Sequence, residues 1–363
     1  MMRYGTIAGR RRAAAGAVAL AASVVLALPG LTGCTGQTGD PVQVASIVPV
    51  PRAAPQPPRF SEAGFLTTDG KILPARQWLP RGPVKAVILA LHGFNDYSNA
   101  FAMPAAEWAK YGIATYAYDQ RGFGRAPGRG LWPGAATLAA DADAAVVALR
   151  AAYPGVPVYL LGESMGGAVA IVAMTGDSGV PIPPVDGVVL SAPAVWGWST
   201  MPIAARVALW AGVRLAPSMT LTGRQLHKLA SDNLPMLRAL SRDPLVIKET
   251  RIDTIDGLVD LMDAAQAAAP RLQGRVLLMY GAHDEIVPRE PVHDFVAHLP
   301  PDAGAVRRLA FYRQGYHMLL RDLEGATVAD DVASWILHAG GRLPSGADNT
   351  TGAGSWPPRQ RDG

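Results

Sequence analysis

P-V-Y-L-L-G-E-S-M-G-G-A-V-A, from Pro157 to Ala170, joins two sequence patterns through one short turn. Residues 158–161 are β-branched, aromatic or large and apolar, which is typical of a buried parallel strand. The small residues from Ala168 onward favour a helix. Between them, residues 162–166 form the pattern G-x-S-x-G, whose glycines permit a tight turn that leaves the serine hydroxyl exposed. Ser164 is therefore the candidate nucleophile, unless the turn is only a glycine-rich connection.

A serine hydroxyl becomes a good nucleophile only when a base takes its proton. The pattern therefore requires an acid and a histidine later in the chain, in the order Ser, Asp or Glu, His. An apolar strand pattern at 275–280 is followed by Asp284, and another at 308–312 is followed by His317. Open α/β sheets place their sites just past the carboxyl ends of strands. Each residue alone has an ordinary structural interpretation, but the three in this order predict a catalytic triad with Ser164.

Strand and helix patterns alternate through most of the chain. Apolar strands are expected at 86–91 and 114–118, with a helix at 100–111 between them. This alternation predicts an α/β protein with a mostly parallel sheet covered by helices on both faces.

Several motifs resemble those of the α/β-hydrolase fold and, within it, the monoacylglycerol lipase and lysophospholipase branch. The resemblance covers the chain from about Arg59 to Gly340. The matching motifs are Leu91-His92-Gly93, Tyr118-Asp119-Gln120-Arg121-Gly122-Phe123-Gly124, the serine turn with Gly167, Asp243-Pro244-Leu245-Val246, Asp284 with Ile286-Val287-Pro288, and Tyr316-His317.

This resemblance implies the layout of an active site. Ser164, Asp284 and His317 would form the triad, and the backbone N–H groups of Phe94 and Met165 would form the oxyanion hole. No metal and no cofactor is implied. The stretch from about 195 to 270, where the alternation stops, would be a helical lid. Its tryptophans either line an acyl-chain pocket or fill a small core of the lid itself.

The N-terminal segment predicts export from the cytoplasm. Four arginines precede an apolar run from Ala13 to Leu28, and Leu31-Thr32-Gly33-Cys34 resembles the lipobox of bacterial lipoproteins. We expect residues 1–33 to be a signal peptide and Cys34 to be lipidated, which would anchor the protein to a membrane of the bacterial cell envelope. An ordinary secretory signal or a short uncleaved anchor are the alternatives. Cys34 is the only cysteine, so no intramolecular disulfide is possible.

The remaining organisation follows from composition. Residues 34–58 begin at the lipidated cysteine and become proline-rich, which predicts an extended, semi-rigid tether. We expect the hydrolase domain at 59–340 and a disordered tail at 341–363. The formal net charge is +4, and the arginines of the leader account for all of it. The charge therefore gives no reason to expect nucleic acid as a partner.

The sequence predicts a membrane-anchored serine ester hydrolase, a monoacylglycerol lipase or lysophospholipase, that acts through an acyl-enzyme on a small lipid or ester. The oligomeric state is open. Asn95-Asp96-Tyr97 replaces the G-E-H usual in the family, and Glu163 stands where histidine is commonest, which leaves the leaving group and the acyl-chain length open. An aminopeptidase of the prolyl type, a haloperoxidase-like perhydrolase, and a catalytically silent lipoprotein that only binds lipid remain alternatives.

Overall fold

The computed structural model describes residues 56–177, 179–223, 228–301, 307–338, 341–348 and Trp356. The predicted signal peptide, the predicted lipidation site Cys34 and the predicted tether up to residue 55 lie outside the described residues. No helix within the described part of the chain is long and apolar enough to span a membrane.

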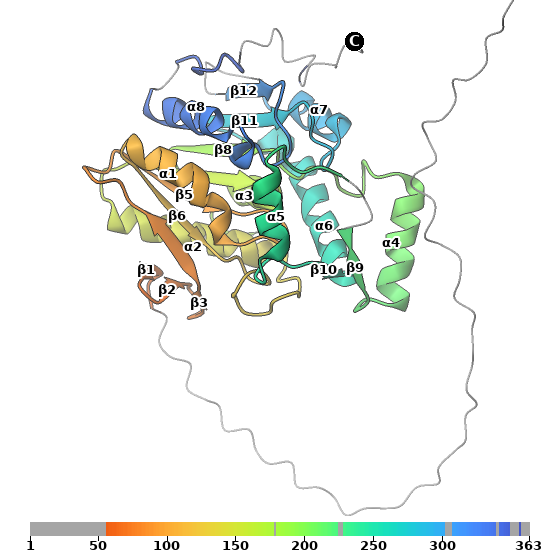
Figure 1. The fold of residues 1–363 in the computed structure, drawn as a ribbon. Coiled ribbons are helices and arrows are strands. Elements are labelled where there is room, and N and C mark those ends of the chain that lie inside the picture. Colours follow the sequence, from red (N-terminus) through yellow and green to blue (C-terminus); the bar gives the residue numbers. More distant parts are fainter. Residues whose placement is uncertain are drawn as a thin grey trace, which may run out of the picture.

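The centre of the fold is a seven-stranded sheet with the order β12-β11-β8-β7-β5-β6-β4 (Figure 1). Its strands are β4 (Ala75–Trp78), β5 (Ala86–Leu91), β6 (Ile113–Tyr118), β7 (Val158–Glu163), β8 (Gly187–Ser191), β11 (Val276–Gly281) and β12 (Arg307–Tyr312). All neighbouring strands pair in parallel except β4, which is antiparallel to β6. The predicted mostly parallel sheet is confirmed.

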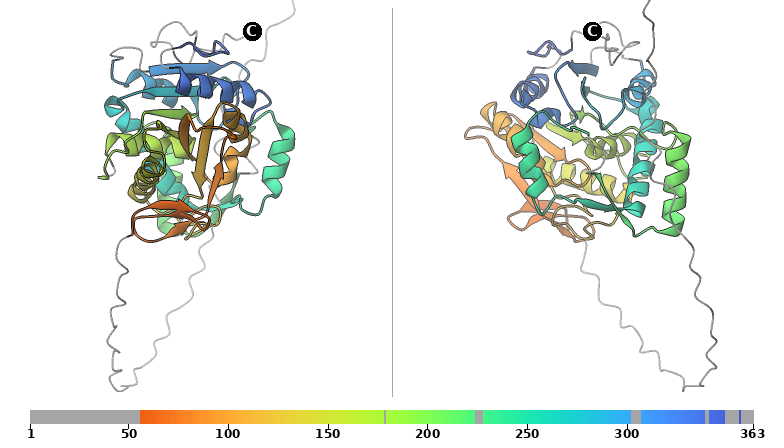
Figure 2. Two further views of the ribbon diagram at one scale, coloured as in Figure 1. Left: turned by 90° about the vertical axis from the view of Figure 1, so that its left-hand side faces the viewer. Right: turned by 45° about the vertical axis from the view of Figure 1, so that its right-hand side comes forward.

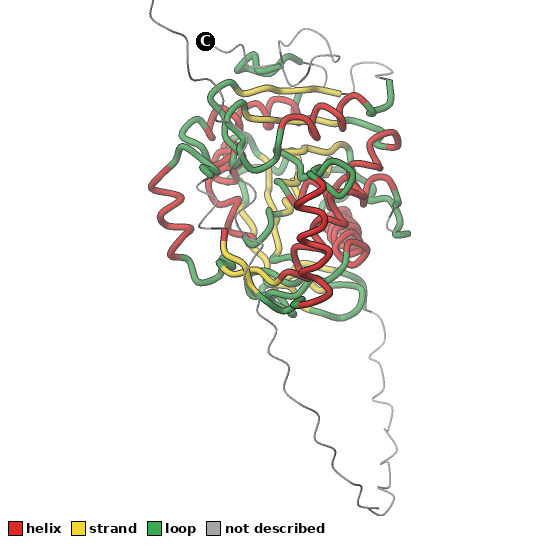
Figure 3. The backbone as a smooth tube through the Cα atoms, turned by 90° about the vertical axis from the view of Figure 1, so that its right-hand side faces the viewer, coloured by secondary structure: helices red, strands yellow, loops and turns green. Residues whose placement is uncertain are grey.

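Helices cover both faces of this sheet, as Figure 3 shows. One apolar core lies beneath α2 (Ala135–Ala152), α3 (Met165–Thr175), α6 (Ile252–Ala268) and α7 (Arg289–Ala297). The other lies beneath α1 (Ala102–Lys110) and α8 (Gly325–Leu337). Strand β5 serves both cores, because successive side chains point to opposite faces. Leu89 enters the first core and Ile88 the second, and both are fully buried.

The stretch between β8 and β11 is where the strand and helix alternation stops. It contains α4 (Ile203–Leu215), β9 (Thr220–Thr222), α5 (Leu234–Arg242), β10 (Glu249–Arg251), α6 and the short 3-10 helix η3 (Ala269–Arg271). β9 and β10 pair as a separate antiparallel ribbon. Helix α6 packs on the central sheet, whereas α4 lies outside α6 and buries none of its residues (Figures 1 and 2).

Two of the tryptophans in this stretch differ in their environment. Trp210 on α4 is 54% exposed, with the guanidinium of Arg214 4.1 Å from its ring centre. Trp198 is half-buried, packs against the main core and donates a hydrogen bond to Asp260. In Trp210 the structure therefore presents an apolar ring to solvent rather than to a core.

Smaller elements complete the domain. They are β1 (Arg59–Ser61), β2 (Gly64–Leu66), β3 (Ile72–Leu73), and the 3-10 helices η1 (Ser98–Phe101) and η4 (Leu319–Arg321). The antiparallel pair β2 and β3 forms a hairpin around the Asp69-Gly70 turn. Gly70 has φ +78°, a left-handed conformation that glycine adopts without strain.

The predicted disordered tail is wrong for residues 341–348. Leu343 is buried in the core beneath α8, and Ser345 donates from its backbone N–H and its hydroxyl to Asp331. Trp356 is also buried, with its ring 6.3 Å from that of Tyr280. The segment is rich in Gly, Pro and Ser and lacks periodicity. Leu343 and Trp356 are isolated apolar residues in it, so they form no pattern that predicts burial.

Candidate active site

Ser164 lies in the turn between β7 and α3. Its φ and ψ are 54° and −116°, a sparsely populated conformation for a residue with a side chain. Both neighbouring glycines are required by close backbone approach. A Cβ on Gly166 would lie 2.0 Å from the carbonyl oxygen of Leu91, and one on Gly162 would lie 2.3 Å from that of Gly166. The G-x-S-x-G pattern therefore forms the strained turn that the sequence predicts.

Asp284 and His317 come together in space from loops that follow adjacent strands. Asp284 lies just beyond β11, and His317 lies beyond β12. Oδ2 of Asp284 and Nδ1 of His317 are 2.9 Å apart. The other carboxylate oxygen of Asp284 accepts hydrogen bonds from the backbone N–H groups of Ile286 and Val287, at 2.8 and 3.0 Å. These bonds fix the carboxylate, which in turn holds the imidazole.

The electrostatics of His317 combine two opposing effects. Burial lowers its pKa, because a charged imidazolium loses its hydration, while the Asp284 carboxylate stabilises that charge. The carboxylate outweighs burial, and the pKa of His317 is raised above its usual value. His317 is 5% exposed, so this balance operates away from bulk water.

The expected oxyanion-hole residues lie beside Ser164. Met165 is the first residue of α3, where backbone N–H groups point out of the helix end. Phe94 follows Gly93, and a Cβ on Gly93 would lie 3.4 Å from the Cβ of Ser164. The ring of Phe94 packs edge-on against Phe123 with 5.6 Å between ring centres. The loop after β5 therefore runs against the serine turn.

His92 holds the beginning of this loop. Its Nε2 accepts a hydrogen bond from the backbone N–H of Gln120 at 2.9 Å, which leaves Nδ1 to donate to the carbonyl of Gly93 at 2.8 Å. Burial lowers the pKa of His92. A neutral imidazole with its proton on Nδ1 satisfies both bonds, so His92 is a structural residue of the loop.

The residues at which the chain departs from the family pattern connect the oxyanion loop to the stretch after β8. Asn95 has φ 64° and accepts from the backbone N–H of Ile247 at 2.9 Å, while its side-chain amide donates to Thr250 at 2.7 Å. The hydroxyl of Tyr97 donates to Asp243 at 2.7 Å. Burial and this hydrogen bond raise the pKa of Tyr97 to about 12. Asp243 is thus engaged away from His317.

A buried ion cluster near the site escaped the sequence interpretation. Arg321 donates through Nη1 to Asp96 at 2.7 Å and through Nη2 to Glu163. All three residues are at most 5% exposed. The sequence did contain a signal at Glu163, an acid where histidine is commonest in the family, whereas Asp96 only replaces the glutamate of the usual G-E-H. Their common partner is distant in sequence and could not be identified from the pattern.

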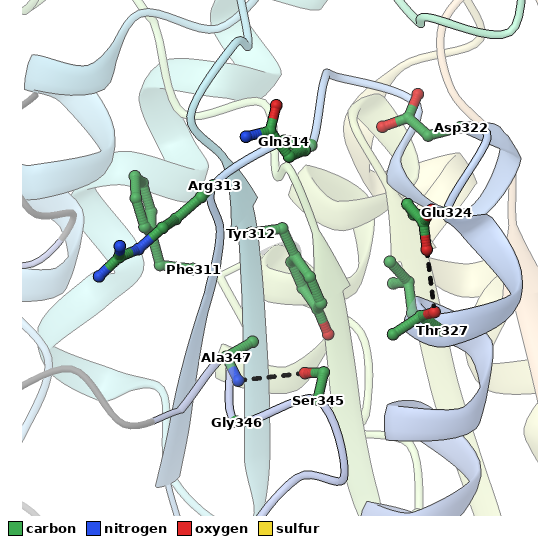
Figure 4. A pocket seen from close by; sticks show the side chains of 12 residues that line it. Phe311, Tyr312, Arg313, Gln314, Asp322, Glu324, Thr327, Ser345, Gly346 and Ala347 are labelled. Atoms are coloured by element: carbon green, nitrogen blue, oxygen red, sulfur yellow. Dashed lines mark hydrogen bonds between the residues drawn. The ribbon is translucent and has the colours of Figure 1, made fainter.

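Two hollows found in the described residues lie apart from the Ser164, Asp284 and His317 side chains. One, of about 310 Å³, is lined by the end of β12, the start of α8 and residues 345–347, with the carboxyl groups of Asp322 and Glu324 on one side (Figure 4). The other is an open groove between residues 129–130 and 241–249. Neither is lined by Ser164, Asp284 or His317.

No group of three or more His, Cys, Asp or Glu side chains able to hold a metal occurs among the described residues.

The serine turn follows β7 of the mostly parallel sheet, the acid follows β11 and the histidine follows β12. This arrangement defines the α/β-hydrolase class. Residues 82–324 match the sequence family described as "Serine aminopeptidase, S33", and the chain belongs to this family. The expected fold and the expectation of a hydrolytic enzyme are confirmed.

Similar proteins of known name span nearly the whole domain. The chain is 28% identical to mouse monoglyceride lipase over 297 residues, which covers 79% of this chain and 94% of the mouse protein. It is 26% identical to monoacylglycerol lipase of Mycolicibacterium smegmatis over 290 residues, covering 76% of this chain and 97% of that protein.

Solved structures of similar fold include two named lipases. The monoacylglycerol lipase of Paleococcus ferrophilus has a TM-score of 0.61 at 23% identity, over 73% of this chain and 98% of that chain. A soluble variant of monoglyceride lipase from Saccharomyces cerevisiae, solved with a substrate analog, has a TM-score of 0.62 at 20% identity, over 80% of this chain and 98% of that chain.

Proposed function

We propose that this protein is a serine ester hydrolase that cleaves monoacylglycerols. The observation that carries the proposal is the Asp284–His317 hydrogen bond of 2.9 Å, formed at the same sheet edge as the strained Ser164 turn. The similarity to two monoacylglycerol lipases over most of their length supports this substrate class.

In the proposed mechanism, Nε2 of His317 takes the proton of the Ser164 hydroxyl as its oxygen attacks the ester carbonyl. Asp284 accepts from Nδ1–H, holds the imidazole in the required tautomer and stabilises the imidazolium. His317 then gives the proton to the leaving alcohol, and an acyl-enzyme remains on Ser164. A water deprotonated by His317 hydrolyses this ester and releases the fatty acid.

The negative charge that develops on the carbonyl oxygen requires donors that are already in place. We assign this role to the backbone N–H groups of Phe94 and Met165. Met165 begins α3, and the N-terminal end of a helix favours a negative charge. The loop that carries Phe94 is held by His92 on one side and by the Asn95 contacts on the other.

A lipid substrate also accounts for the exposed apolar side chains of α4. Ile203, Val207, Trp210 and Leu215 are 75%, 59%, 54% and 84% exposed. An apolar helix face left outside the core suits contact with a membrane or micelle surface from which single-chain lipids are taken. A lysophospholipid presents the same single acyl chain, so the head group needs a direct test.

We further propose that the protein is exported and anchored to a bacterial membrane through lipids on Cys34. The support is the leader sequence, in which a basic segment and an apolar run precede Leu31-Thr32-Gly33-Cys34. Residues 35–58 would then hold the domain off the membrane surface.

The proposed function is tested with soluble protein that begins after Cys34. Its turnover is measured on monoacylglycerols of graded chain length, lysophosphatidylcholine, short p-nitrophenyl esters and proline naphthylamide, with Ser164→Ala as the control. We expect hydrolysis of monoacylglycerols that Ser164→Ala abolishes. Turnover of the naphthylamide without ester hydrolysis would replace the lipase with an aminopeptidase, and peracid formation from acetate and peroxide as the main activity would indicate a perhydrolase.

A further inference from the structure

Three of the four segments that carry groups of the proposed active site also carry one member each of the buried ion cluster, and the segment of Asp284 carries none. Glu163 directly precedes Ser164, Asp96 follows the oxyanion residue Phe94 by two positions, and Arg321 follows His317 by four. The chain thus brings one charged residue from each loop to a common point.

The contacts make Arg321 the centre of this cluster. Its Nη1 donates to Asp96 at 2.7 Å and its Nη2 to Glu163, and its side chain is 4% exposed. A guanidinium is planar and presents its donors in a fixed fork, so two carboxylates bound to one fork are fixed relative to each other. A lysine ammonium would keep the charge but not this geometry.

We propose that Arg321 is a positioning residue that holds the loops of Ser164, Phe94 and His317 in one arrangement. This rests on the proposed function, because the three loops matter together only if they carry a nucleophile, an oxyanion donor and a base.

Stability alone is a weak reason for such a cluster. Replacing a buried ion group by well-packed hydrophobic side chains of similar volume is often neutral or stabilising, because the charges lose their hydration in the interior. Three buried charges joined across loops that are distant in sequence are better explained by the fixed geometry they impose. A displacement of about 1 Å in a reacting group can cost about 10²-fold in rate.

The cluster also acts on the protonation of His317. The charged groups that act on this imidazole are Asp284, which is hydrogen-bonded to it, and the two cluster members Glu163 and Arg321. The Glu163 carboxylate raises the pKa of His317, and the Arg321 guanidinium lowers it. Removing one charge or the other should therefore move the pKa of His317 in opposite directions.

The first test is a kinetic comparison on a soluble ester. Arg321→Lys should lower kcat by about 10²-fold while KM changes by less than about 3-fold, since positioning affects the transition state more than binding. The matched control is Arg121→Lys. Arg121 also bonds two carboxylates, Asp69 and Asp141, and neither of these lies next to Ser164, Phe94 or His317 in the sequence. The control should keep wild-type kcat.

The second test uses neutral variants and pH. The acidic limb of kcat/KM reports His317, because activity is lost as pH falls through its pKa. Glu163→Gln should shift this limb to lower pH, and Arg321→Gln should shift it to higher pH. The triple variant Asp96→Asn, Glu163→Gln, Arg321→Met carries no charge in the cluster and should fold, yet keep the reduced kcat.

The outcomes separate this proposal from the proposed function. If wild-type protein hydrolyses no ester, the proposed function fails. If wild-type protein is active and the triple variant has the same kcat and the same acidic limb, Arg321 is only structural and the proposal is wrong. If Arg321→Lys does not fold, the opposite pH shifts of Glu163→Gln and Arg321→Gln still decide, and unchanged limbs in both would overturn it.

Discussion

Ser164 has a backbone conformation that a side-chain-bearing residue adopts only when its surroundings enforce it. The enforcing contacts are local, because Gly162 and Gly166 approach neighbouring carbonyls too closely for any Cβ. This is why the turn could be predicted from five letters of sequence. The Asp284–His317 pair could be predicted for a related reason, since both follow apolar strand patterns whose ends meet at one sheet edge.

The identity of the acid is open to a direct comparison. Asp284→Asn should lower kcat by about 10⁴-fold, because an asparagine would favour the wrong imidazole tautomer. Asp243→Asn should keep most activity, since Asp243 accepts from Tyr97 rather than facing His317. Both variants would be assayed side by side on the same ester, and the reverse ranking would refute the assignment.

A buried carboxylate next to the histidine loop gives a pH-dependent stability. Asp322 accepts from Ser231 and from the backbone N–H of Tyr316. Burial raises its pKa from 3.8 to about 6 despite these bonds. The native state therefore binds the proton of Asp322 more tightly than the unfolded state does. The contribution of Asp322 to the free energy of unfolding is complete below pH 4 and is lost as pH rises through 6.

This effect is measured as a difference between two unfolding curves. The free energy of unfolding of Asp322→Asn, minus that of wild type, should rise by up to about 3 kcal/mol between pH 4 and 7. This follows from about 1.4 kcal/mol for each unit by which the pKa differs between the folded and unfolded states. Urea titrations at several pH values supply both curves. Any constant cost of the amide cancels from the slope, and parallel curves would contradict the assigned pKa.

At the scale of elements, the central strands and their helices could be predicted because each is buried on a regular face. Their apolar residues recur with the period of the element. The stretch after β8 breaks this alternation of strands and helices. Helix α4 buries none of its residues, and its packing depends on contacts with α6 that no local pattern specifies. The Arg321 cluster could not be predicted either, since its three residues meet only through tertiary structure.

Two tryptophans distinguish a core helix from an outer one. Trp108 on α1 is fully buried and donates to the carbonyl of Ala329, whereas Trp210 on α4 is 54% exposed. Trp108→Ala should lower the free energy of unfolding by about 3–5 kcal/mol, because it leaves a large cavity. Trp210→Ala should change it by less than about 0.5 kcal/mol, as surface substitutions usually do. Equal losses in denaturant titrations would show that α4 is packed more tightly than the structure indicates.

At the scale of the whole molecule, the proposed lipid anchor on Cys34 would determine where the enzyme works. A diacylglyceryl cysteine carries at least two acyl chains, and each buried CH₂ contributes about 0.8 kcal/mol to membrane binding. The wild-type protein should fractionate with membranes and incorporate labelled palmitate. Cys34→Ala should be either uncleaved or soluble, with its esterase activity intact. An unmodified residue other than Cys34 at the mature N-terminus would contradict this and indicate a simple secreted hydrolase.

The central claim is that one serine in this molecule is an activated nucleophile. Its most direct test is labelling of the folded protein with a fluorophosphonate probe, followed by mass spectrometry of the labelled peptide. The account predicts a single adduct on Ser164, lost in His317→Ala and in heat-denatured protein, because a serine without its base is a poor nucleophile. Absence of labelling in active, folded protein, or an adduct on another serine, would contradict it.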